Sequence, residues 1–276
     1  MFTLNCNGRL LVAKQALVMG IINSTPDSFY QGSRQQSVDA ILRKAGTMLS
    51  EGADIIDVGG QSSRPGSKRV SEEEELLRVM DGVVALHREY PSAIISIDTF
   101  YANVAREAVA AGASIVNDIS AGSIDPKMIS TVGSLNVPYV LMHMKGTPQT
   151  MQQSAVYENV CRDVLDFLAY KIPELKSAGI RDIIIDPGFG FGKTIDHNLE
   201  LLNHLELLKI IPHPLLFGIS RKATIWKTLD ISAEDALNGT TVLNTVGLLK
   251  GADILRVHDV REAKEAIKLI AALGQG

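Results

Sequence analysis

Short apolar runs lie along nearly the whole chain, and each of them ends on a polar or charged residue. None of the runs alternates between apolar and polar positions, which is typical of strands that are buried on both faces of a parallel sheet. Each is followed by a loop and a segment with helical periodicity. The eight runs are residues 17–23, 55–57, 94–98, 115–118, 139–143, 183–186, 215–220 and 254–258. We therefore predict an α/β protein with eight strand–helix units, the number that a closed (β/α)8 TIM barrel requires.

The intervening segments predict the rest of this barrel. The expected helices are residues 35–51, 71–89, 101–111, 126–135, 155–178, 196–209, 233–250 and 259–273. Residues 1–16 have the pattern of a hairpin, which we expect to close the bottom of the barrel. An extra short helix, residues 222–228, follows the seventh strand; in barrels such a helix often binds an anion, although a longer loop is the alternative. No linker-like segment interrupts residues 1–276, so we predict one domain.

Composition narrows the classes of partner. The length of 276 residues suits one barrel, and the net charge of −4 offers no basic field for nucleic acid or anionic membranes. The two cysteines, Cys6 and Cys161, indicate a reducing compartment more than a disulfide framework. No export signal or membrane span is recognisable. We expect a cytoplasmic protein that acts on small molecules.

Polar side chains gather at the predicted carboxyl ends of the strands, where barrels of this type carry their chemistry. Buried carboxylates need hydrogen-bond donors or cations beside them. One aspartate after a strand is usually a cap or turn residue, but several on one rim indicate a site. The carboxylates and amides are Asp57, Asp98, Asp118, Asp186, Asn23 and Asn117. The donors and cations expected beside them are Lys222, Arg64, Arg256 and His258.

The eighth strand ends with a cation and an imidazole two residues apart. Arg256 and His258 point to the same face of a strand because side chains alternate with a period of two. Inside a barrel mouth this pair suits a phosphate or a pyrophosphate. The alternative is a structural ion pair of Arg256 with Asp253 or Asp259.

A glycine-rich segment, residues 186–193, follows the sixth strand. Its three alternating glycines permit positive φ and close backbone approach. It is neither a P-loop nor a dinucleotide fingerprint, because Pro187 and Lys193 stand where those motifs need glycine. It is either a flexible lid or a loop that holds Phe189 and Phe191 near a flat ligand. The sequence also has no zinc motif and no activated hydroxyl nucleophile, so covalent catalysis is not indicated.

Ordered motifs along the chain together resemble the dihydropteroate synthase family. They cover residues 19–23, the loop at 62–66, and residues 96–99, 117–119, 142–148, 186–193, 220–222 and 256–260. The resemblance implies an enzyme that joins 4-aminobenzoate to 6-hydroxymethyl-7,8-dihydropterin pyrophosphate, making 7,8-dihydropteroate for folate synthesis. It also implies a homodimer that forms through the last helices of the barrel.

The resemblance also assigns site residues. The catalytic set would be Asp98, Asp186, Lys222 and Asn23. The pterin would bind Asp98, Asn117, Met142, Asp186, Gly218 and Lys222. The pyrophosphate would bind Asn23, Ser63, Arg64, Arg256 and His258, with Mg²⁺ held by Asn23 and phosphate oxygens. The aminobenzoate would bind Phe29, Ser63, Pro65, Phe191, Lys222 and Ala223.

The sequence departs from the common pattern of this family at several positions. These are Gln31 and Gln61, where acidic residues are usual, Ser63 in place of Thr, Lys145 in place of Arg, and Ala223 in place of Ser. Ala223 removes a hydroxyl near the expected carboxylate of aminobenzoate, and Gln31 removes a loop carboxylate. We expect a weakened rate or altered affinity for aminobenzoate and sulfonamides, and no loss of function.

Two other functions compete with this interpretation. A methyltransferase that passes a methyl group from methyltetrahydrofolate to a corrinoid protein shares the pterin positions, but it has no need for the loop at 62–66 or for the Arg256 and His258 pair. A catalytically silent pterin-binding paralogue is the second alternative, suggested by the changes at Gln31 and Ala223.

Overall fold

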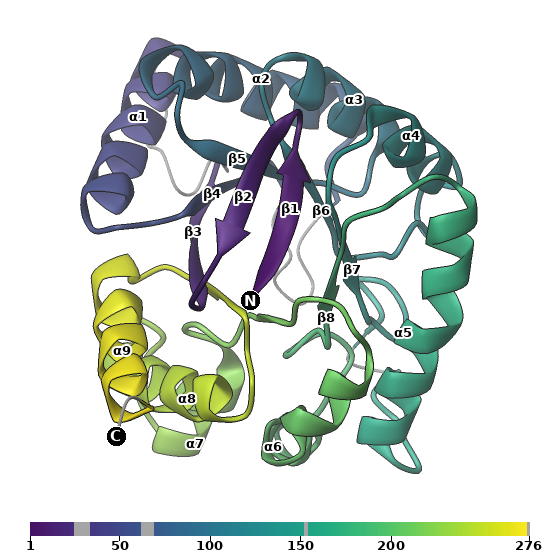
Figure 1. Ribbon diagram of the computed structural model, residues 1–276, viewed down its shortest axis with the longest axis vertical. Helices are drawn as coiled ribbons and strands as arrows, with labels where there is room; N and C mark the ends of the chain where they lie inside the picture. The colour runs from purple at the N-terminus through teal and green to yellow at the C-terminus, as the bar shows by residue number, and fades with distance from the viewer. Residues whose placement is uncertain (25–33, 62–68, 152–153, 275–276) are drawn as a thin grey trace.

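A ring of parallel strands forms the centre of the molecule (Figure 1). The computed structural model describes residues 1–24, 34–61, 69–151 and 154–274. Within them, the strands of the ring are β3 (Leu17–Asn23), β4 (Ile55–Gly59), β5 (Ile94–Asp98), β6 (Ile115–Asp118), β7 (Tyr139–Met142), β8 (Ile183–Asp186), β9 (Leu216–Phe217) and β10 (Ile254–Val257). Their order is β8-β7-β6-β5-β4-β3-β10-β9. The predicted (β/α)8 barrel is therefore confirmed.

The ring closes between β8 and β9 by a short contact. Ile185 forms a parallel bridge with Leu215, and the Ile185 N–H donates to the Pro214 carbonyl at 2.9 Å. The seventh strand is shorter than the predicted run 215–220, because the chain leaves the sheet at Gly218 and turns at Ser220–Arg221 toward the next helix.

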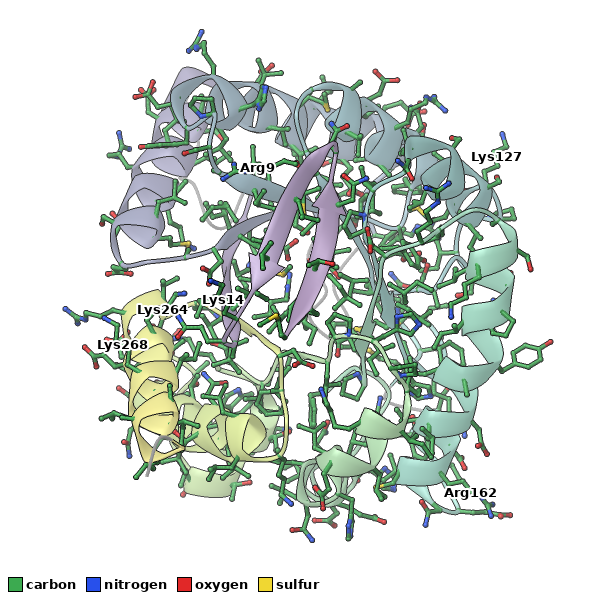
Figure 2. All side chains as sticks on the ribbon, viewed as in Figure 1. Arg9, Lys14, Lys127, Arg162, Lys264 and Lys268 are labelled. Atoms are coloured by element: carbon green, nitrogen blue, oxygen red, sulfur yellow. The ribbon has the colours of Figure 1, made fainter. Side chains whose placement is uncertain are left out.

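Helices surround the ring on its outer side (Figure 1). They are α1 (Arg34–Ser50), α2 (Glu72–Glu89), α3 (Ala102–Ala110), α4 (Met128–Leu135), α5 (Val160–Ser177), α6 (Ile195–Asn203), α7 (Ala223–Leu229), α8 (Leu237–Leu249) and α9 (Val260–Leu273), with a 3₁₀ helix η1 (Leu205–Ile210) after α6. The expected extra helix after the seventh strand is α7. In Figure 2 the labelled Lys127, Arg162 and Lys268 extend outward from this helical layer.

Three predicted helices differ from the observed ones by more than two residues or are divided. The segment 155–178 becomes helical only at Val160, because the Asn159 side chain caps its start by accepting the Arg162 N–H at 2.9 Å. The segment 196–209 is divided at His204 into α6 and η1. The segment 233–250 starts at Leu237, after a turn.

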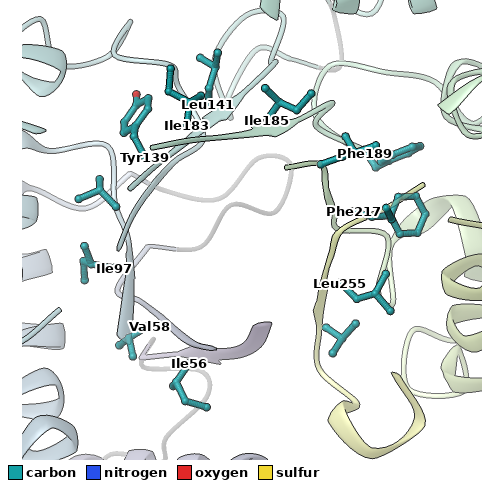
Figure 3. Packing of buried hydrophobic residues seen from close by; sticks show 14 of the residues in the cluster. Ile56, Val58, Ile97, Tyr139, Leu141, Ile183, Ile185, Phe189, Phe217 and Leu255 are labelled. Atoms are coloured by element: carbon teal, nitrogen blue, oxygen red, sulfur yellow. The ribbon is translucent and has the colours of Figure 1, made fainter. Parts of the chain in front are cut away.

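Side chains on the strands alternate between the inside of the barrel and the helical layer. In β4, Ile55 belongs to the cluster inside the barrel, whereas Ile56 and Val58 pack in the larger cluster under the helices. Figure 3 shows Ile56, Val58, Ile97 and other members of that larger cluster. Because helices cover the outer positions, both faces are apolar, and the alternation is invisible in the sequence.

The N-terminal hairpin covers the amino-terminal ends of the strands. It consists of β1 (Phe2–Cys6) and β2 (Arg9–Ala13), joined through Asn7 and Gly8, whose φ angles are 53° and 84°. Leu4 packs in one cluster with inward side chains of the barrel strands, and the hairpin crosses the ring in Figure 1. The predicted hairpin thus lies at one end of the barrel, and the polar strand ends lie at the other.

Candidate functional site at the carboxyl ends of the strands

Arg256 occupies the centre of the mouth and contacts two carboxylates. Its Nε donates to Asp57 Oδ2 at 2.7 Å, and its Nη2 donates to Asp98 Oδ2 at 2.6 Å. The predicted alternative pairing with Asp253 or Asp259 is wrong, since Arg256 points into the barrel. Asp253 instead pairs with Lys209, and Asp259 pairs with Arg221.

Burial controls the charge of this cluster. Asp57 is fully buried, and the side chains of Asp98 and Arg256 are each 16% exposed. Burial raises the pKa of Asp98, and Arg256 opposes that shift while Asp57 adds to it. Burial alone would lower the pKa of Arg256, but Asp57 and Asp98 raise it above its ordinary value. The guanidinium is therefore permanently charged, and Asp98 holds a proton more readily than an isolated aspartate does.

Asn117 extends the cluster to a fourth strand. Its Nδ2 donates to Asp57 Oδ2 at 3.1 Å, so side chains from β4, β5, β6 and β10 are joined through Asp57 and Arg256. Asp57 Oδ1 and the neighbouring Ser96 Oγ are buried without a hydrogen-bond partner among the described residues. Asp57 was on the predicted rim but in none of the predicted binding sets, although it joins Asn117 of the pterin set to Arg256.

Asp186 and Lys222 form a second group beside the first. Asp186 Oδ1 accepts the Gly188 N–H at 2.7 Å, and Lys222 Nζ donates to the Phe189 carbonyl. Lys222 Nζ also lies 4.7 Å from the centre of the Phe191 ring. Burial lowers the pKa of Lys222 to about 8, against the opposing effect of Asp186. Lys222 also interacts electrostatically with Asp98 and Arg256, so the two groups share one mouth.

The glycine-rich segment 186–193 has the expected backbone but a different use of its phenylalanines. Gly188, Gly190 and Gly192 have φ angles of 70°, 79° and 63°. At Gly188 a Cβ would stand 2.0 Å from the His143 carbonyl oxygen, so the close approach also requires glycine. The hypothesis that Phe189 faces a flat ligand is wrong: the side chain is fully buried and packs edge-on against Phe217 at 4.9 Å (Figure 3).

Phe191 lies on the side of the mouth. It is 6% exposed and clusters with Phe100, Ile119, Met142 and Met151. Met142, which ends β7, is thus beside Phe191, as a flat ligand shared between them would require.

A buried lysine that the sequence did not single out fastens this segment to β7. Lys193 Nζ lies 2.9 Å from His143 Nδ1 and donates to the carbonyls of Gly188 at 3.0 Å and Phe191 at 3.1 Å. Burial lowers the pKa of His143 to about 3 and that of Lys193 to about 7. A neutral imidazole therefore accepts from the lysine. The only signal in the sequence was an unexplained lysine directly after the glycines.

Asp118 is not part of the mouth, although the sequence placed it on the same rim. It accepts hydrogen bonds from the Tyr139 hydroxyl at 2.7 Å, from the Ser120 N–H at 2.7 Å and from the Gly122 N–H at 2.8 Å. Because Asn117 points inward, the next residue must point to the helical layer. Asp118 is therefore a turn residue, the ordinary role of an aspartate after a strand.

The remaining predicted residues lie around the mouth. Asn23 is partly buried at the end of β3, next to Gly59 of β4. Gly218 lies close to both Arg256 and Lys222, since a Cβ there would be in ordinary contact, 3.9 Å from Arg256 Cβ and from Lys222 Nζ. Ala223 is the first residue of α7.

His258 contributes a neutral group. Its Nδ1 lies 3.0 Å from Ser220 Oγ, and burial lowers its pKa to about 4. The eighth strand thus presents an uncharged imidazole beside the permanently charged Arg256.

Five predicted or discussed positions lie outside the described residues: Phe29, Gln31, Ser63, Arg64 and Pro65. The other three unusual positions, Gln61, Lys145 and Ala223, lie within the described residues. Gln61 exchanges two hydrogen bonds with the backbone of Val70 and donates to Glu75 Oε2 at 2.7 Å. Because Glu75 is fully buried, the amide avoids placing a second carboxylate beside it. Lys145 Nζ donates to the Val156 carbonyl and lies 4.5 Å from the centre of the Tyr157 ring.

The described residues contain no group of three or more His, Cys, Asp and Glu side chains that could hold a metal ion. Asn23 offers one amide oxygen at the mouth. Mg²⁺ is commonly held by one or two protein oxygens together with substrate phosphates, so this donor set fits Mg²⁺ only when a phosphate ligand supplies further oxygens.

Comparison with known proteins supports a shared family. The family model described as pterin binding enzyme matches residues 19–258. The chain is 41% identical to a dihydropteroate synthase of Clostridium beijerinckii, covering 94% of each chain. It is 44% identical to a mitochondrial folate synthesis bifunctional protein of Pisum sativum; 97% of this chain aligns, but it spans only 55% of that protein's length. A structure of Xanthomonas albilineans dihydropteroate synthase with 4-aminobenzoic acid has a TM-score of 0.93 and 38% identity, covering 99% of this chain and 98% of the other.

The neutral state of His143 makes stability depend on pH. The folded imidazole has a pKa of about 3 against 6.5 in its ordinary state, so the unfolded chain binds the proton more tightly. As the pH falls below 6.5, this residue therefore lowers the free energy of unfolding, by up to about 1.4 kcal/mol per pH unit. In His143→Asn, where an amide oxygen replaces Nδ1 as acceptor, we expect this loss to disappear. Urea denaturation of both proteins between pH 7 and pH 4.5 measures the difference.

His204→Asn, at an exposed histidine after α6, is the matched control and should follow the wild-type pH curve. Parallel curves for wild type and His143→Asn would show that His143 is not buried as a neutral group.

Proposed function

The chain belongs to the pterin binding enzyme family and, within it, to the dihydropteroate synthases, and we propose that its strand-end mouth condenses 6-hydroxymethyl-7,8-dihydropterin pyrophosphate with 4-aminobenzoate. The products are 7,8-dihydropteroate and pyrophosphate, and the protein is a transferase of folate synthesis. The observation that carries the site assignment is the convergence of Asp98, Asn117, Asp186, Lys222 and Arg256 on one barrel mouth.

The pterin binds where carboxylate, amide and ammonium groups meet. Its ring edge presents amino and N–H donors beside a carbonyl acceptor. Asp186 and Asn117 accept from the donors, and Lys222 donates to the acceptor. Met142, 2% exposed, packs on the ring. A ring that lacks these groups should bind poorly, because Asp186 and Asn117 would remain buried without hydrogen-bond partners.

The pyrophosphate lies toward β3 and β10, near Asn23, Arg256 and His258. Support comes from the permanent charge of Arg256 and from the neutral imidazole, which accommodates a second cation. Ser63 and Arg64 complete this subsite in the proposal, although they lie outside the described residues. Asn23 would hold Mg²⁺ together with phosphate oxygens; when bound, Mg²⁺ neutralises charge on the leaving group.

The reaction needs no nucleophile from the protein. The bond between the pterin methylene and the pyrophosphate oxygen breaks, and its electron pair leaves with the oxygen. The resulting cation is delocalised into the pterin ring, and the carboxylates of Asp98 and Asp57 stabilise it. The amine nitrogen of aminobenzoate then forms the new C–N bond and loses one proton. The apolar cluster around Phe191 and Met142 limits access of water to the cation.

Aminobenzoate binds beside Phe191, Lys222 and Ala223. The ring stacks near Phe191, and the carboxylate is attracted by the Lys222 ammonium and the first N–H groups of α7. Phe29, Ser63 and Pro65 complete this subsite in the proposal and lie outside the described residues. Without the usual serine hydroxyl, Ala223 leaves recognition of the carboxylate to backbone N–H groups and Lys222.

The protein works in a reducing, cytoplasmic compartment and forms a homodimer. Cys6 and Cys161 are both free and buried, which suits a reducing compartment. No helix in the described part of the chain is long and apolar enough to cross a membrane. For the dimer, α7, α8 and α9 lie at one side of the barrel and expose large apolar side chains: Leu229, Val242, Leu249, Leu269 and Leu273. A face of this kind is typical of an interface between subunits.

We expect Val242→Glu to convert the dimer to a monomer, because it places a charge on the exposed face of α8, where Val242 is 53% exposed. Sedimentation velocity would show a change from twice the chain mass of 29.8 kDa to that mass. Leu77→Glu, at a side chain 60% exposed on α2, is the control and should leave the mass unchanged. A monomeric wild-type protein would exclude the proposed interface.

The purified protein should release one pyrophosphate for each dihydropteroate formed when both substrates and Mg²⁺ are present. Chelation of Mg²⁺ should suppress the reaction, since charge on the leaving group is then poorly neutralised. Chromatography of the pterin product and a phosphate assay after pyrophosphatase measure the two products. Methyl transfer from methyltetrahydrofolate to a corrinoid protein would indicate the methyltransferase, and pterin binding without pyrophosphate release would indicate the silent paralogue.

Substitution of an inward-facing aspartate should mainly reduce activity, whereas substitution of an outward-facing one should mainly reduce stability. Asp186→Asn should lower kcat/KM by about 100-fold or more, because it removes an inward carboxylate that binds the pterin. Asp118→Asn should keep kcat within a few-fold of wild type but reduce stability by about 1–3 kcal/mol, since an amide cannot accept all the hydrogen bonds of that carboxylate. Steady-state kinetics and urea denaturation separate the two effects. Equal losses of activity would contradict the inward and outward assignment.

A further inference from the structure

Arg221 has an unusual backbone conformation between two residues of the mouth. Its φ angle is +54°, in the left-handed region that residues with a side chain seldom adopt. Ser220 precedes it and contacts His258, while Lys222 follows it and is the N-cap residue before α7. Backbone strain of this kind persists only where surrounding contacts enforce it.

The guanidinium supplies those contacts away from the mouth. Its Nε and Nη2 donate to the two oxygens of Asp259 at 2.9 Å and 2.8 Å, a bidentate ion pair. Its Nη1 donates to the carbonyls of Ala233 at 3.1 Å and Glu234 at 2.6 Å. The Arg221 N–H donates to Thr240 Oγ1 at 3.1 Å. One residue is thereby fastened to the N-cap residue of α9, to the turn before α8 and to α8 itself.

The conformation at Arg221 decides where the two flanking side chains lie. On one side, Ser220 Oγ is 3.0 Å from His258 Nδ1 and accepts the His258 N–H at 3.2 Å. On the other side, Lys222 Nζ reaches the Phe189 carbonyl and the Phe191 ring. A rotation at residue 221 would displace Lys222 from both of these partners.

We propose that Arg221 is a positioning residue, whose ion pair with Asp259 holds the left-handed turn that aims Lys222 at the pterin and aminobenzoate sites. The proposal rests on the proposed function, since it concerns the same reaction. Arg221 itself touches neither substrate in this arrangement, because the Asp259, Ala233 and Glu234 oxygens use its guanidinium. A misplacement of Lys222 by about 1 Å is enough to reduce the rate about 100-fold.

Three variants separate the ion pair from the backbone strain. Arg221→Gly accepts a positive φ without strain but loses the ion pair. Asp259→Asn leaves Arg221 unchanged and removes only the charge of its partner. The double variant combines both changes. Lys209→Ala, which removes an ion pair with Asp253 near the start of β10, is the matched control far from the mouth.

If the ion pair positions Lys222, both single variants lower kcat, Arg221→Gly by about 100-fold. The double variant should be no slower than Arg221→Gly, because the two residues act as one unit. Lys209→Ala should keep wild-type kcat. If Arg221→Gly does not fold, Asp259→Asn decides alone. A folded Arg221→Gly protein with wild-type kcat overturns the proposal. If that variant does not fold, wild-type kcat in Asp259→Asn overturns it.

The pH profile of kcat/KM gives a readout that a merely structural residue would not move. Lys222 is surrounded by Asp186, Asp98 and Arg256, and burial lowers its pKa to about 8. Activity that needs the charged lysine is lost as the pH rises through that pKa. When Lys222 is released toward solvent, its pKa rises and the basic limb moves to higher pH. The limb should shift in Arg221→Gly and Asp259→Asn and stay in place in Lys209→Ala; an unmoved limb in all three overturns the proposal.

The same measurements distinguish a failure of the proposed function from a failure of the positioning role. A wild-type protein that makes no dihydropteroate contradicts the proposed function. An active wild type whose Arg221 and Asp259 variants match Lys209→Ala contradicts the positioning role alone.

Discussion

The mouth of the barrel depends on one buried cation between two carboxylates. Arg256 contacts Asp57 and Asp98, which lie on β4 and β5, and Asn117 of β6 donates to Asp57. Removing one member of such a buried pair typically costs about 3–5 kcal/mol, because a charge is then left without a partner. The cluster therefore restrains four strands at their carboxyl ends, and within it two carboxylates face one cation. That imbalance suits a ligand on which positive charge develops, and it makes a further cation useful wherever a pyrophosphate binds.

Beyond this centre, two further sets of polar contacts hold the loops that carry Phe191 and Lys222. Lys193 fastens the glycine-rich segment to His143, and Arg221 fastens the turn before α7 to Asp259. Both are cations that make several hydrogen bonds to backbone or side-chain oxygens, so each fixes the position of a loop without facing the mouth. Phe191 and Lys222 owe their places to these contacts. Residues that face the mouth and residues that hold its loops are therefore different, because loops that carry binding groups need rigid support from neighbouring elements.

Apolar packing fills the barrel below the mouth and covers it on the outside. The hairpin and the inward side chains of the strands fill the lower part, including Leu4, Met19 and Ile254. Helices cover the outer side, where Tyr139 is fully buried and its hydroxyl donates a hydrogen bond to Asp118. A polar residue on a strand therefore faces one of two environments, the mouth or the helical layer. The choice depends on its position in the alternation and not on its chemistry.

The sequence by itself determined the class of fold, the strands to within a residue or two at most ends, the extra helix α7 and the family. These follow from local patterns: apolar runs, glycine positions and motifs in a fixed order. It also identified the residues that the structure joins at the mouth, including Asp98, Asn117 and Asp186. Only the tertiary structure decided that Arg256 pairs with Asp57 and Asp98, that Asp118 turns outward, that Phe189 is a core residue and that Lys193 and Arg221 support the site. Asp57 and Arg256 are 199 positions apart. Such contacts arise only when the barrel closes, because covered outer faces hide the alternation of the strands and no local pattern records which distant charges will meet.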